Sequence, residues 1–170
     1  MFENDLFEFF SRIPPWQPPV IFVPIIAWAI YSSVGATSIA STGLLFMVGL
    51  LHWTLLEYWA HRVLFHWEPE SKIGKKFVWY LHGVHHDWPN DKYRLVFPPA
   101  LSVPLAILHF YAYVAIFGQQ WTYGAFAGLT FGYLAYDMIH YYTHHFAPTN
   151  PILKYLRRYH MAHHFKHEPN

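Results

Sequence analysis

The stretch from Ile13 to Leu56, IPPWQPPVIFVPIIAWAIYSSVGATSIASTGLLFMVGLLHWTLL, contains no Asp, Glu, Lys or Arg. A second uncharged run extends from residue 95 to residue 136. Each run is about twice the ~20 residues that a helix needs to cross a bilayer. Core helices of a soluble protein can also be apolar, but two uncharged runs of this length favour lipid surroundings. The sequence therefore predicts a membrane protein.

Both uncharged runs are interrupted near their middle by residues typical of turns, at 35–38 and at 118–120. This pattern predicts two helical hairpins, and the PPWQPP segment at 14–19 predicts a stiff entry into the first of them. The predicted membrane helices cover residues 19–35, 39–60, 98–117 and 121–142. We therefore expect an all-α membrane protein with four transmembrane helices in two hairpins, forming a single integral-membrane domain over residues 1–170.

The composition agrees with this assignment, because 54% of the 170 residues are hydrophobic and only 12% are charged. The chain has no cysteine, so disulfides and thiolate metal sites are excluded, and any metal must be held by nitrogen and oxygen ligands. The formal net charge is only +1, which provides no basic field for nucleic acid. The unusual feature is histidine, with 14 residues against 11 Lys and Arg.

Two hairpins place the N-terminus, residues 57–96 and the C-terminal tail on one side of the membrane. All 11 Lys and Arg fall on that side, which the positive-inside rule identifies as cytoplasmic. The N-terminal MFENDLFEFF lacks the basic segment of a cleavable signal peptide. We therefore expect a multi-pass protein with both termini in the cytoplasm, in the endoplasmic reticulum of a eukaryote or the inner membrane of a bacterium.

Four clusters of histidines lie just outside, or at the end of, the predicted membrane helices. They are His61 and His66; His82, His85 and His86; His140 and His144; and His160, His163 and His164. Residues three or four apart share one face of a helix, so the members of each of the last three clusters can point together. His61 and His66 are five apart, so we expect His66 to lie past the helix end and to fold back towards the same centre.

Ten imidazoles exceed what one ion can bind, because zinc takes four ligands and an octahedral ion six. We therefore predict two ions. Imidazole suits zinc, copper, iron and nickel, so the ligands alone do not choose the metal. An isolated histidine is usually a hydrogen-bonded residue, and we assign that role to the other four. They are His52, His109, His145 and His167.

Two carboxylates occupy positions from which they could orient metal-binding histidines. Glu57 precedes His61 by four residues and Asp137 precedes His140 by three. Each could accept the second ring N–H of its histidine. A carboxylate as deep as Asp137 needs a donor, because an unpaired charge at that depth is costly.

These clusters and their neighbours resemble the fatty acid 2-hydroxylases of the membrane fatty acid hydroxylase and sterol desaturase superfamily. The resemblance covers about residues 57–167, in the segments EYWAHRVLFH, LHGVHHDW, RLVFPP, GYLAYDMIHYYTHH and HMAHHFKH. The histidine clusters alone would define only the superfamily, whereas RLVFPP and YDMIHYY point to the 2-hydroxylases.

The resemblance implies a four-helix membrane base carrying a cytosolic, histidine-rich helical cap that holds a dimetal centre facing the bilayer. It implies two iron ions, O2 and electrons from cytochrome b5 or an equivalent donor, used to hydroxylate C2 of a fatty acyl chain taken from the bilayer, free or within ceramide. Zinc can replace iron in purified protein, because nitrogen ligands also suit zinc. The ten clustered histidines are the implied metal ligands. Tyr136 and Asp137 match the family's Tyr-Asp pair beside the metals and are the catalytic candidates.

The chain departs from the family in two respects. It has no segment resembling the haem-binding His-Pro-Gly-Gly of an N-terminal cytochrome b5 domain, so we expect a separate electron-transfer protein. Members of the family also continue beyond the position that matches Asn170, with a segment that packs against the cap.

Three alternatives differ in function. A sterol or carotenoid hydroxylase or desaturase of the same superfamily is disfavoured by RLVFPP. A metal transporter is disfavoured because transport sites usually lie near the bilayer midplane, whereas these clusters lie at one edge. A structural zinc module would bind zinc tightly and consume no O2. For the hydroxylase, Arg62, Trp88 and Arg94 are candidates for contact with the lipid head group.

Overall fold

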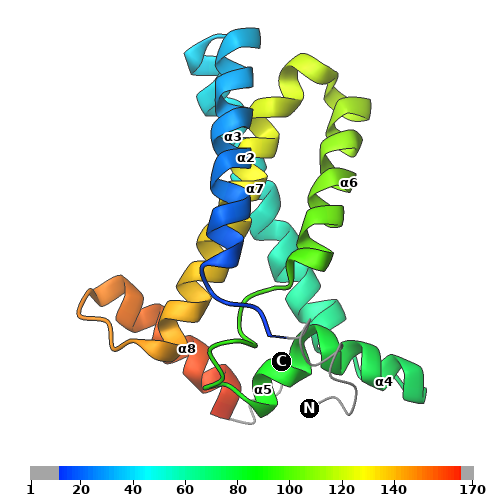
Figure 1. Ribbon diagram of the computed structural model, residues 1–170, viewed down its shortest axis with the longest axis vertical. Helices are drawn as coiled ribbons and strands as arrows, with labels where there is room; N and C mark the ends of the chain where they lie inside the picture. The colour runs from blue at the N-terminus through cyan, green and yellow to red at the C-terminus, as the bar shows by residue number, and fades with distance from the viewer. Residues whose placement is uncertain (1–11, 166–170) are drawn as a thin grey trace. The chain divides into compact units, whose positions relative to one another are not determined.

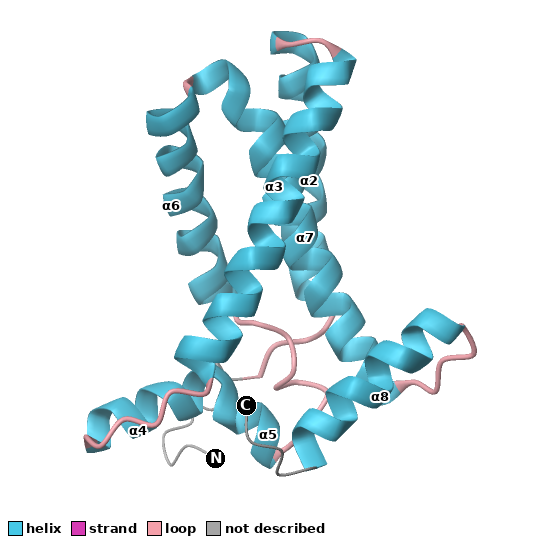
Figure 2. Ribbon diagram, turned by 180° about the vertical axis from the view of Figure 1, so that it is seen from behind, coloured by secondary structure: helices cyan, strands magenta, loops and turns pink. Residues whose placement is uncertain are grey.

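The computed structural model describes residues 12–165, which are largely helical and contain no β-strand (Figure 1). In this part of the chain four long helices lie close to the predicted membrane helices: α2 (Gln17–Ala36), α3 (Ile39–Trp59), α6 (Pro99–Phe117) and α7 (Gln119–His145). The remaining described elements are η1 (Ala60–Phe65), α4 (Lys72–Val78), η2 (Trp79–Gly83), α5 (Val84–Asp87) and α8 (Pro151–Phe165). Figure 2 shows these helices from behind, joined by loops. The all-helical prediction is confirmed.

Among residues 12–165, three helices are long and apolar enough to cross a membrane: α2, the continuous helix of α3 and η1, and α6. The chain is therefore a membrane protein, as predicted. A membrane span at α7 stays a prediction, because its composition is less apolar than that of the other three.

The chain divides into two compact units whose segments alternate along the sequence. Unit 1 comprises residues 1–15, 58–96 and 138–170, and unit 2 comprises residues 16–57 and 97–137. The single integral-membrane domain predicted over residues 1–170 stays a prediction. Every Lys and Arg belongs to unit 1, whereas Glu57 and Asp137 are the only formal charges in unit 2.

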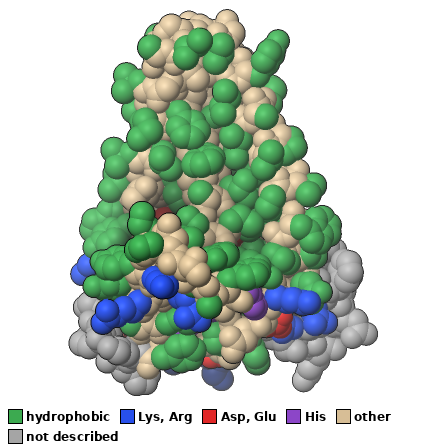
Figure 3. Space-filling view, turned by 90° about the vertical axis from the view of Figure 1, so that its left-hand side faces the viewer, with side chains coloured by type: hydrophobic (Ala, Val, Ile, Leu, Met, Phe, Trp, Pro, Cys, Tyr) green, Lys and Arg blue, Asp and Glu red, His purple; other side chains and the backbone are tan. Residues whose placement is uncertain are grey.

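In unit 2, α7 is the interior helix. Its residues Thr122, Ala125 and Ala127 have no exposed surface. The other helices carry large apolar side chains on their outer faces, such as Tyr31 on α2, 82% exposed, and Ile116 on α6, 70% exposed. Figure 3 shows hydrophobic side chains covering much of one face, while Lys and Arg gather in a separate zone. Outer faces of this kind match lipid, whereas most residues of α7 between positions 122 and 134 are covered by protein.

Helices α3 and α7 cross with their backbones in contact. A Cβ atom on Gly128 of α7 would lie 1.9 Å from the carbonyl oxygen of Phe46, and one on Gly49 of α3 would lie 1.8 Å from the carbonyl oxygen of Ala125. Only glycine fits at either position. Close approach at small residues is how membrane helices pack, because lipid provides no hydrophobic driving force between them.

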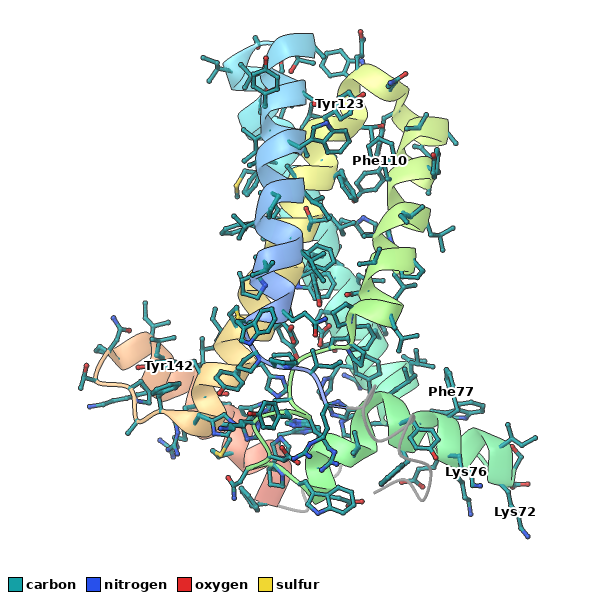
Figure 4. All side chains as sticks on the ribbon, viewed as in Figure 1. Lys72, Lys76, Phe77, Phe110, Tyr123 and Tyr142 are labelled. Carbon is teal, nitrogen blue, oxygen red and sulfur yellow. The ribbon has the colours of Figure 1, made fainter. Side chains whose placement is uncertain are left out.

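Aromatic and polar contacts join α6 to the other helices of unit 2. Trp28 of α2 packs against Phe110 of α6 and Tyr123 of α7, with ring centroids 5.9 and 5.5 Å apart (Figure 4). His52 Nδ1 of α3 hydrogen-bonds the Tyr113 hydroxyl of α6. The four long helices of unit 2 are thus linked through aromatic rings and one histidine.

Both predicted turns are confirmed. Helix α2 ends at Ala36 and α3 begins at Ile39, and the Ser33 and Thr42 hydroxyls, 3.0 Å apart, join the two helices beside the turn. Gly118 separates α6 from α7 with φ of 80°, a conformation that favours glycine. The breaks between consecutive long helices therefore fall where the uncharged runs are interrupted.

Few hydrophobic side chains are buried in the described part of unit 1. Its buried hydrophobic residues among those described are Ile13, Leu95 and Val96. His82, His85 and His144 are buried to a similar degree. Imidazole rings therefore occupy positions that aliphatic side chains fill in an ordinary small domain.

Candidate metal centre

The histidine clusters lie in unit 1 and converge through their Nε2 atoms. Two groups have ligand atoms that all lie within 4.8 Å of one another. The five-histidine group consists of His85, His140, His144, His160 and His164, and the four-histidine group consists of His61, His66, His82 and His163. Nine of the ten predicted ligands therefore fall into two groups, which is the number of ions expected from the sequence.

The five-histidine group is drawn from α5, α7 and α8. The Nε2 atom of His85 lies 3.0 Å from that of His140. The Nε2 atom of His160 lies 2.7 Å from that of His144 and 3.1 Å from that of His164. Three separate segments of sequence thus supply one set of donors.

The four-histidine group depends on a local change of helix type. Residues 60–65 form the π-helical segment η1, in which hydrogen bonds close over five residues instead of four. This geometry brings His61 and His66, five apart in sequence, to an Nε2 separation of 3.1 Å, and His163 Nε2 lies 3.2 Å from each. His66 lies just past the end of η1, as expected.

The second π-helical segment, η2, separates two histidines of the next cluster into different groups. His82 lies on η2 and belongs to the four-histidine group, whereas His85 lies on α5 and belongs to the five-histidine group. The expectation that each cluster forms one chelating face is therefore wrong. The C-terminal cluster divides in the same way, with His163 in one group and His160 in the other. Each of these helices links both groups.

His86 belongs to neither group but lies between them. Its Nε2 atom is 2.8 Å from that of His82, and its ring stacks on His164 with centroids 4.2 Å apart. It thus contacts one member of each group.

The spacing of the donors suits bound metal ions. Two nitrogens that each lie about 2.1 Å from one ion are about 3.0 Å apart at a right angle and about 3.4 Å apart in a tetrahedron. The Nε2 separations of 2.7–3.2 Å are close to this range. Lone pairs of neutral imidazoles repel at such distances unless a proton or a cation lies between them. The residues present therefore fit a pair of nitrogen-bound ions.

Burial favours the neutral form of several of these imidazoles, and the charge of neighbouring rings adds to the effect. The pKa of His86, His144 and His163 falls to about 4 and that of His160 and His164 to about 2. Burial, followed by the charge of His140, also lowers the pKa of His85. The unprotonated imidazole is the form that binds metal, so these six residues are in their binding form at neutral pH.

The histidines excluded from the ligand set lie elsewhere. His109 Nδ1 hydrogen-bonds the Leu105 carbonyl oxygen at 2.8 Å, the helical bond predicted for it. His52 also makes a hydrogen bond, but its partner is Tyr113 on another helix. His145 belongs to neither group, and His167 lies outside the described residues.

Asp137 belongs to unit 2 and is buried, with 3% of its surface exposed. Its Oδ1 accepts a hydrogen bond of 3.1 Å from the backbone N–H of Phe97, and Oδ2 has no hydrogen-bond partner among the described residues. The Tyr133 hydroxyl donates to the Phe97 carbonyl oxygen at 3.4 Å. Side chains of α7 thus hydrogen-bond both polar groups of the Phe97 backbone. This anchoring of RLVFPP to α7 was not predicted from the sequence.

Tyr136 and Glu57 also form a pair within unit 2, because the Tyr136 hydroxyl donates a hydrogen bond to the Glu57 carboxylate. The predicted hydrogen bonds to Asp137 from His140 and to Glu57 from His61 stay predictions. Within unit 2, the structure pairs Asp137 with a backbone amide and Glu57 with a tyrosine hydroxyl.

The basic residues suggested for the head group differ in their surroundings. Arg94 is 10% exposed, lies 2.5 Å from the Asp91 carboxylate and packs over Trp88. Arg62 is exposed and donates to the Tyr58 hydroxyl at 2.8 Å. Arg94 therefore holds its own loop, which leaves Arg62 as the better placed of the two for a lipid head group.

Comparison with known proteins agrees with this geometry. The dihydroceramide fatty acyl 2-hydroxylase FAH2 of Arabidopsis thaliana is 41% identical over 97% of this chain and 70% of its own length. The ceramide very long chain fatty acid hydroxylase SCS7 of Saccharomyces cerevisiae is 39% identical over 98% of this chain and 44% of its own.

A solved structure described as full length scs7p, with only the hydroxylase domain visible, superposes with a TM-score of 0.91 at 38% identity. It matches 98% of this chain and 63% of that one. Residues 46–170, which include every clustered histidine, match the profile of the fatty acid hydroxylases. The chain belongs to the fatty acid hydroxylase family.

Proposed function

We propose that the chain is a membrane-bound oxygenase that hydroxylates C2 of a fatty acyl chain, using O2 and two iron ions. The observation that carries this proposal is the pair of histidine groups, whose Nε2 atoms converge in a chain of this family. The relatives named above are a dihydroceramide fatty acyl 2-hydroxylase and a ceramide fatty acid hydroxylase, which supports an acyl chain that is free or part of ceramide as the substrate.

The five-histidine group would hold one ion and the four-histidine group the other, with His86 next to both groups. Bound together, the ions would supply the redox chemistry that O2 needs to attack an unactivated C–H bond, which side chains alone cannot do. Iron fits this role, and zinc, which has no redox chemistry, should occupy the same nitrogens without activity.

The protein's own contribution is to fix the donors and exclude water from them. The imidazoles are neutral and half-buried or buried, so their lone pairs are available without proton release at neutral pH. Asp137 holds the Phe97 backbone, and through it the RLVFPP segment, against α7. We assign Asp137 and Tyr136 to positioning near the reacting acyl chain.

We also propose that α7 crosses the membrane, giving four spans with the histidines on the cytoplasmic side. The hydropathy of α7 is too low to identify it as a span, because its face towards the other helices is made of Gly, Ala and Thr. Membrane helices use these residues to pack closely. A 27-residue helix is long enough to span the bilayer. The concentration of every Lys and Arg in unit 1 favours the cytoplasmic side for that unit.

Electrons would come from a separate protein, such as cytochrome b5. The test is to express the chain with a donor in cells that lack 2-hydroxy lipids and to identify the products by lipid mass spectrometry. The expected product is a 2-hydroxy acyl chain, absent with His140→Ala. A hydroxylated sterol or carotenoid, or no product from iron-loaded protein with a working donor, would contradict the proposal.

A further inference from the structure

Helix α4 carries an exposed apolar stripe beside exposed lysines. Ile73 is 83% exposed and Phe77 is 49% exposed, and residues four apart share one face of a helix. Lys72 and Lys76 have the same spacing. Figure 4 shows Phe77 projecting from one side of α4 and Lys72 and Lys76 from the other. The helix is therefore amphipathic, and its apolar side is left open.

The orientation of this stripe is fixed by the start of the helix. Ser71 caps α4, because its hydroxyl accepts the backbone N–H of Gly74 at 3.1 Å. A Cβ on Gly74 would lie 2.6 Å from the Pro69 side chain, so this face of α4 packs closely on the preceding loop. Ile73 and Phe77 lie on a different face of α4 from Gly74, and that face stays exposed.

The lysines of α4 have no fixed counter-charge in the described part of the chain. Neither Lys72, Lys75 nor Lys76 forms an ion pair with residues 12–165, and all three are exposed. Glu68 and Glu70 precede them on the same loop. The helix itself contains no acidic residue, so its charged side is uniformly positive.

Chain connectivity keeps α4 near the membrane. The candidate span of residues 39–65 ends seven residues before Lys72, and a connection of this length reaches at most about 25 Å. The exposed rings of Tyr58, Trp59 and Trp67 surround the end of the span. Tyr and Trp gather at the level of the lipid head groups, which indicates that the connection starts there.

From these observations we infer that α4 lies in the plane of the membrane surface and binds anionic phospholipids. Ile73 and Phe77 enter the boundary between head groups and acyl chains, while the lysines contact lipid phosphates and carboxylates, as in other interfacial amphipathic helices. An acidic protein partner would use the lysines but not the open apolar stripe. Helical structure is continuous from Lys72 to Asp87, so the same lipid contact also steadies His82 and His85.

The absence of cysteine allows a direct test. Phe77→Cys is labelled with an environment-sensitive fluorophore whose ring replaces the phenyl group, and the full chain is placed in nanodiscs of phosphatidylcholine with or without phosphatidylserine. Lipids with a nitroxide just below the head group act as quenchers. The same measurement is made after Lys72, Lys75 and Lys76 are all changed to Gln, and in a control with Lys154→Gln and Arg158→Gln on α8.

The expected result is blue-shifted emission and nitroxide quenching that increase with phosphatidylserine and decrease with salt. Each lysine near an anionic surface contributes about a fivefold factor in association, so the triple change should weaken it roughly 100-fold, while the α8 control should have no effect. The salt dependence needs no lysine variant and decides the question if the triple variant is unstable. Emission that is independent of phosphatidylserine, or that changes only when an acidic electron-transfer protein is added, would overturn the inference.

Discussion

Adding one methyl group at Gly128 should loosen the membrane bundle. In Gly128→Ala the new Cβ would lie 1.9 Å from the Phe46 carbonyl oxygen, whereas real Cβ atoms essentially never come closer than 3.0 Å. The obstacle is backbone, so no side chain can rotate away. Helices α3 and α7 must therefore separate locally by at least about 1 Å.

The size of the effect follows from this separation. Overpacking of this kind costs about 1–3 kcal/mol, because the neighbouring contacts along both helices lengthen together. Gly43→Ala is the matched control. Gly43 lies on α3, the partner helix of the crossing, but a Cβ there would meet nothing within 4 Å. In that variant alanine's higher helix propensity should make α3 slightly more stable, by up to about 1 kcal/mol.

The assay is unfolding of the purified protein in mixed micelles by sodium dodecyl sulfate, followed by circular dichroism. Gly49→Ala should destabilise the protein as Gly128→Ala does, because its Cβ would lie 1.8 Å from the Ala125 carbonyl oxygen at the same crossing. Once the helices have separated, one movement accommodates both methyl groups. The double variant should therefore cost clearly less than the sum of the two single changes.

Two results would refute this reasoning. If Gly128→Ala and Gly43→Ala unfolded at the same detergent fraction, the close approach of α3 and α7 would have no energetic weight. If the costs of Gly49→Ala and Gly128→Ala were fully additive, the two glycines would not share one crossing.

Further predictions concern the metal centre and the topology. Wild-type protein should contain two ions per chain by elemental analysis, and His85→Ala about one; a wild-type value of one would contradict the two-ion site. The pKa of His163 is lowered from 6.5 to about 4, so the unfolded chain takes up protons at a higher pH than the folded one. The melting temperature of metal-free protein should therefore be constant above pH 6.5 and fall between pH 6.5 and pH 4, and a flat profile would show that the imidazoles are not desolvated. Asp137→Asn should remain folded but lose 10–100-fold in activity or metal affinity; wild-type values in both would make Asp137 a helix-end residue only. A cysteine at Thr149 should react with an impermeant reagent from the cytoplasm and one at Gln120 should not, and the reverse pattern would invert the topology.

The positions of the long helices were predictable because the thickness of a bilayer sets their length and charge is excluded from them. Residues 19–35 and 98–117 lie within one residue or two of α2 and α6. The packing of α7 was not found by the same reasoning, because hydropathy measures affinity for lipid and α7 faces protein. The recurrence of Gly124, Gly128 and Gly132 is the signal that could have located its contact with α3.

The identity of the clustered histidines was also predictable from spacing, but their division into groups was not. The two π-helical segments rotate His61 and His82 away from α-helical positions, and no residue pattern used above distinguishes them from α-helix. The separation of His82 from His85 depends further on where α8 places His163 and His160. The periodicity of the sequence cannot predict such tertiary contacts.

The Phe97 donor to Asp137 could not be predicted from the sequence, for a related reason. Its need for a partner followed from its depth, and the nearest donor in sequence was the ring of His140. The partner found is the amide of Phe97, which is 40 residues distant. Side-chain types do not reveal backbone donors, although the two Pro residues after Phe97 mark the start of α6.

The histidine interior of unit 1 has a consequence for how much of the protein a cell maintains. Aliphatic cores form from the chain alone, whereas a cluster of mutually repelling imidazoles gains cohesion when metal enters, so binding energy becomes folding energy. Polypeptide made when the metal is scarce should therefore remain partly open in unit 1 and be degraded by membrane proteases. The steady-state abundance of the protein should then follow the supply of metal, even when the transcript level is constant.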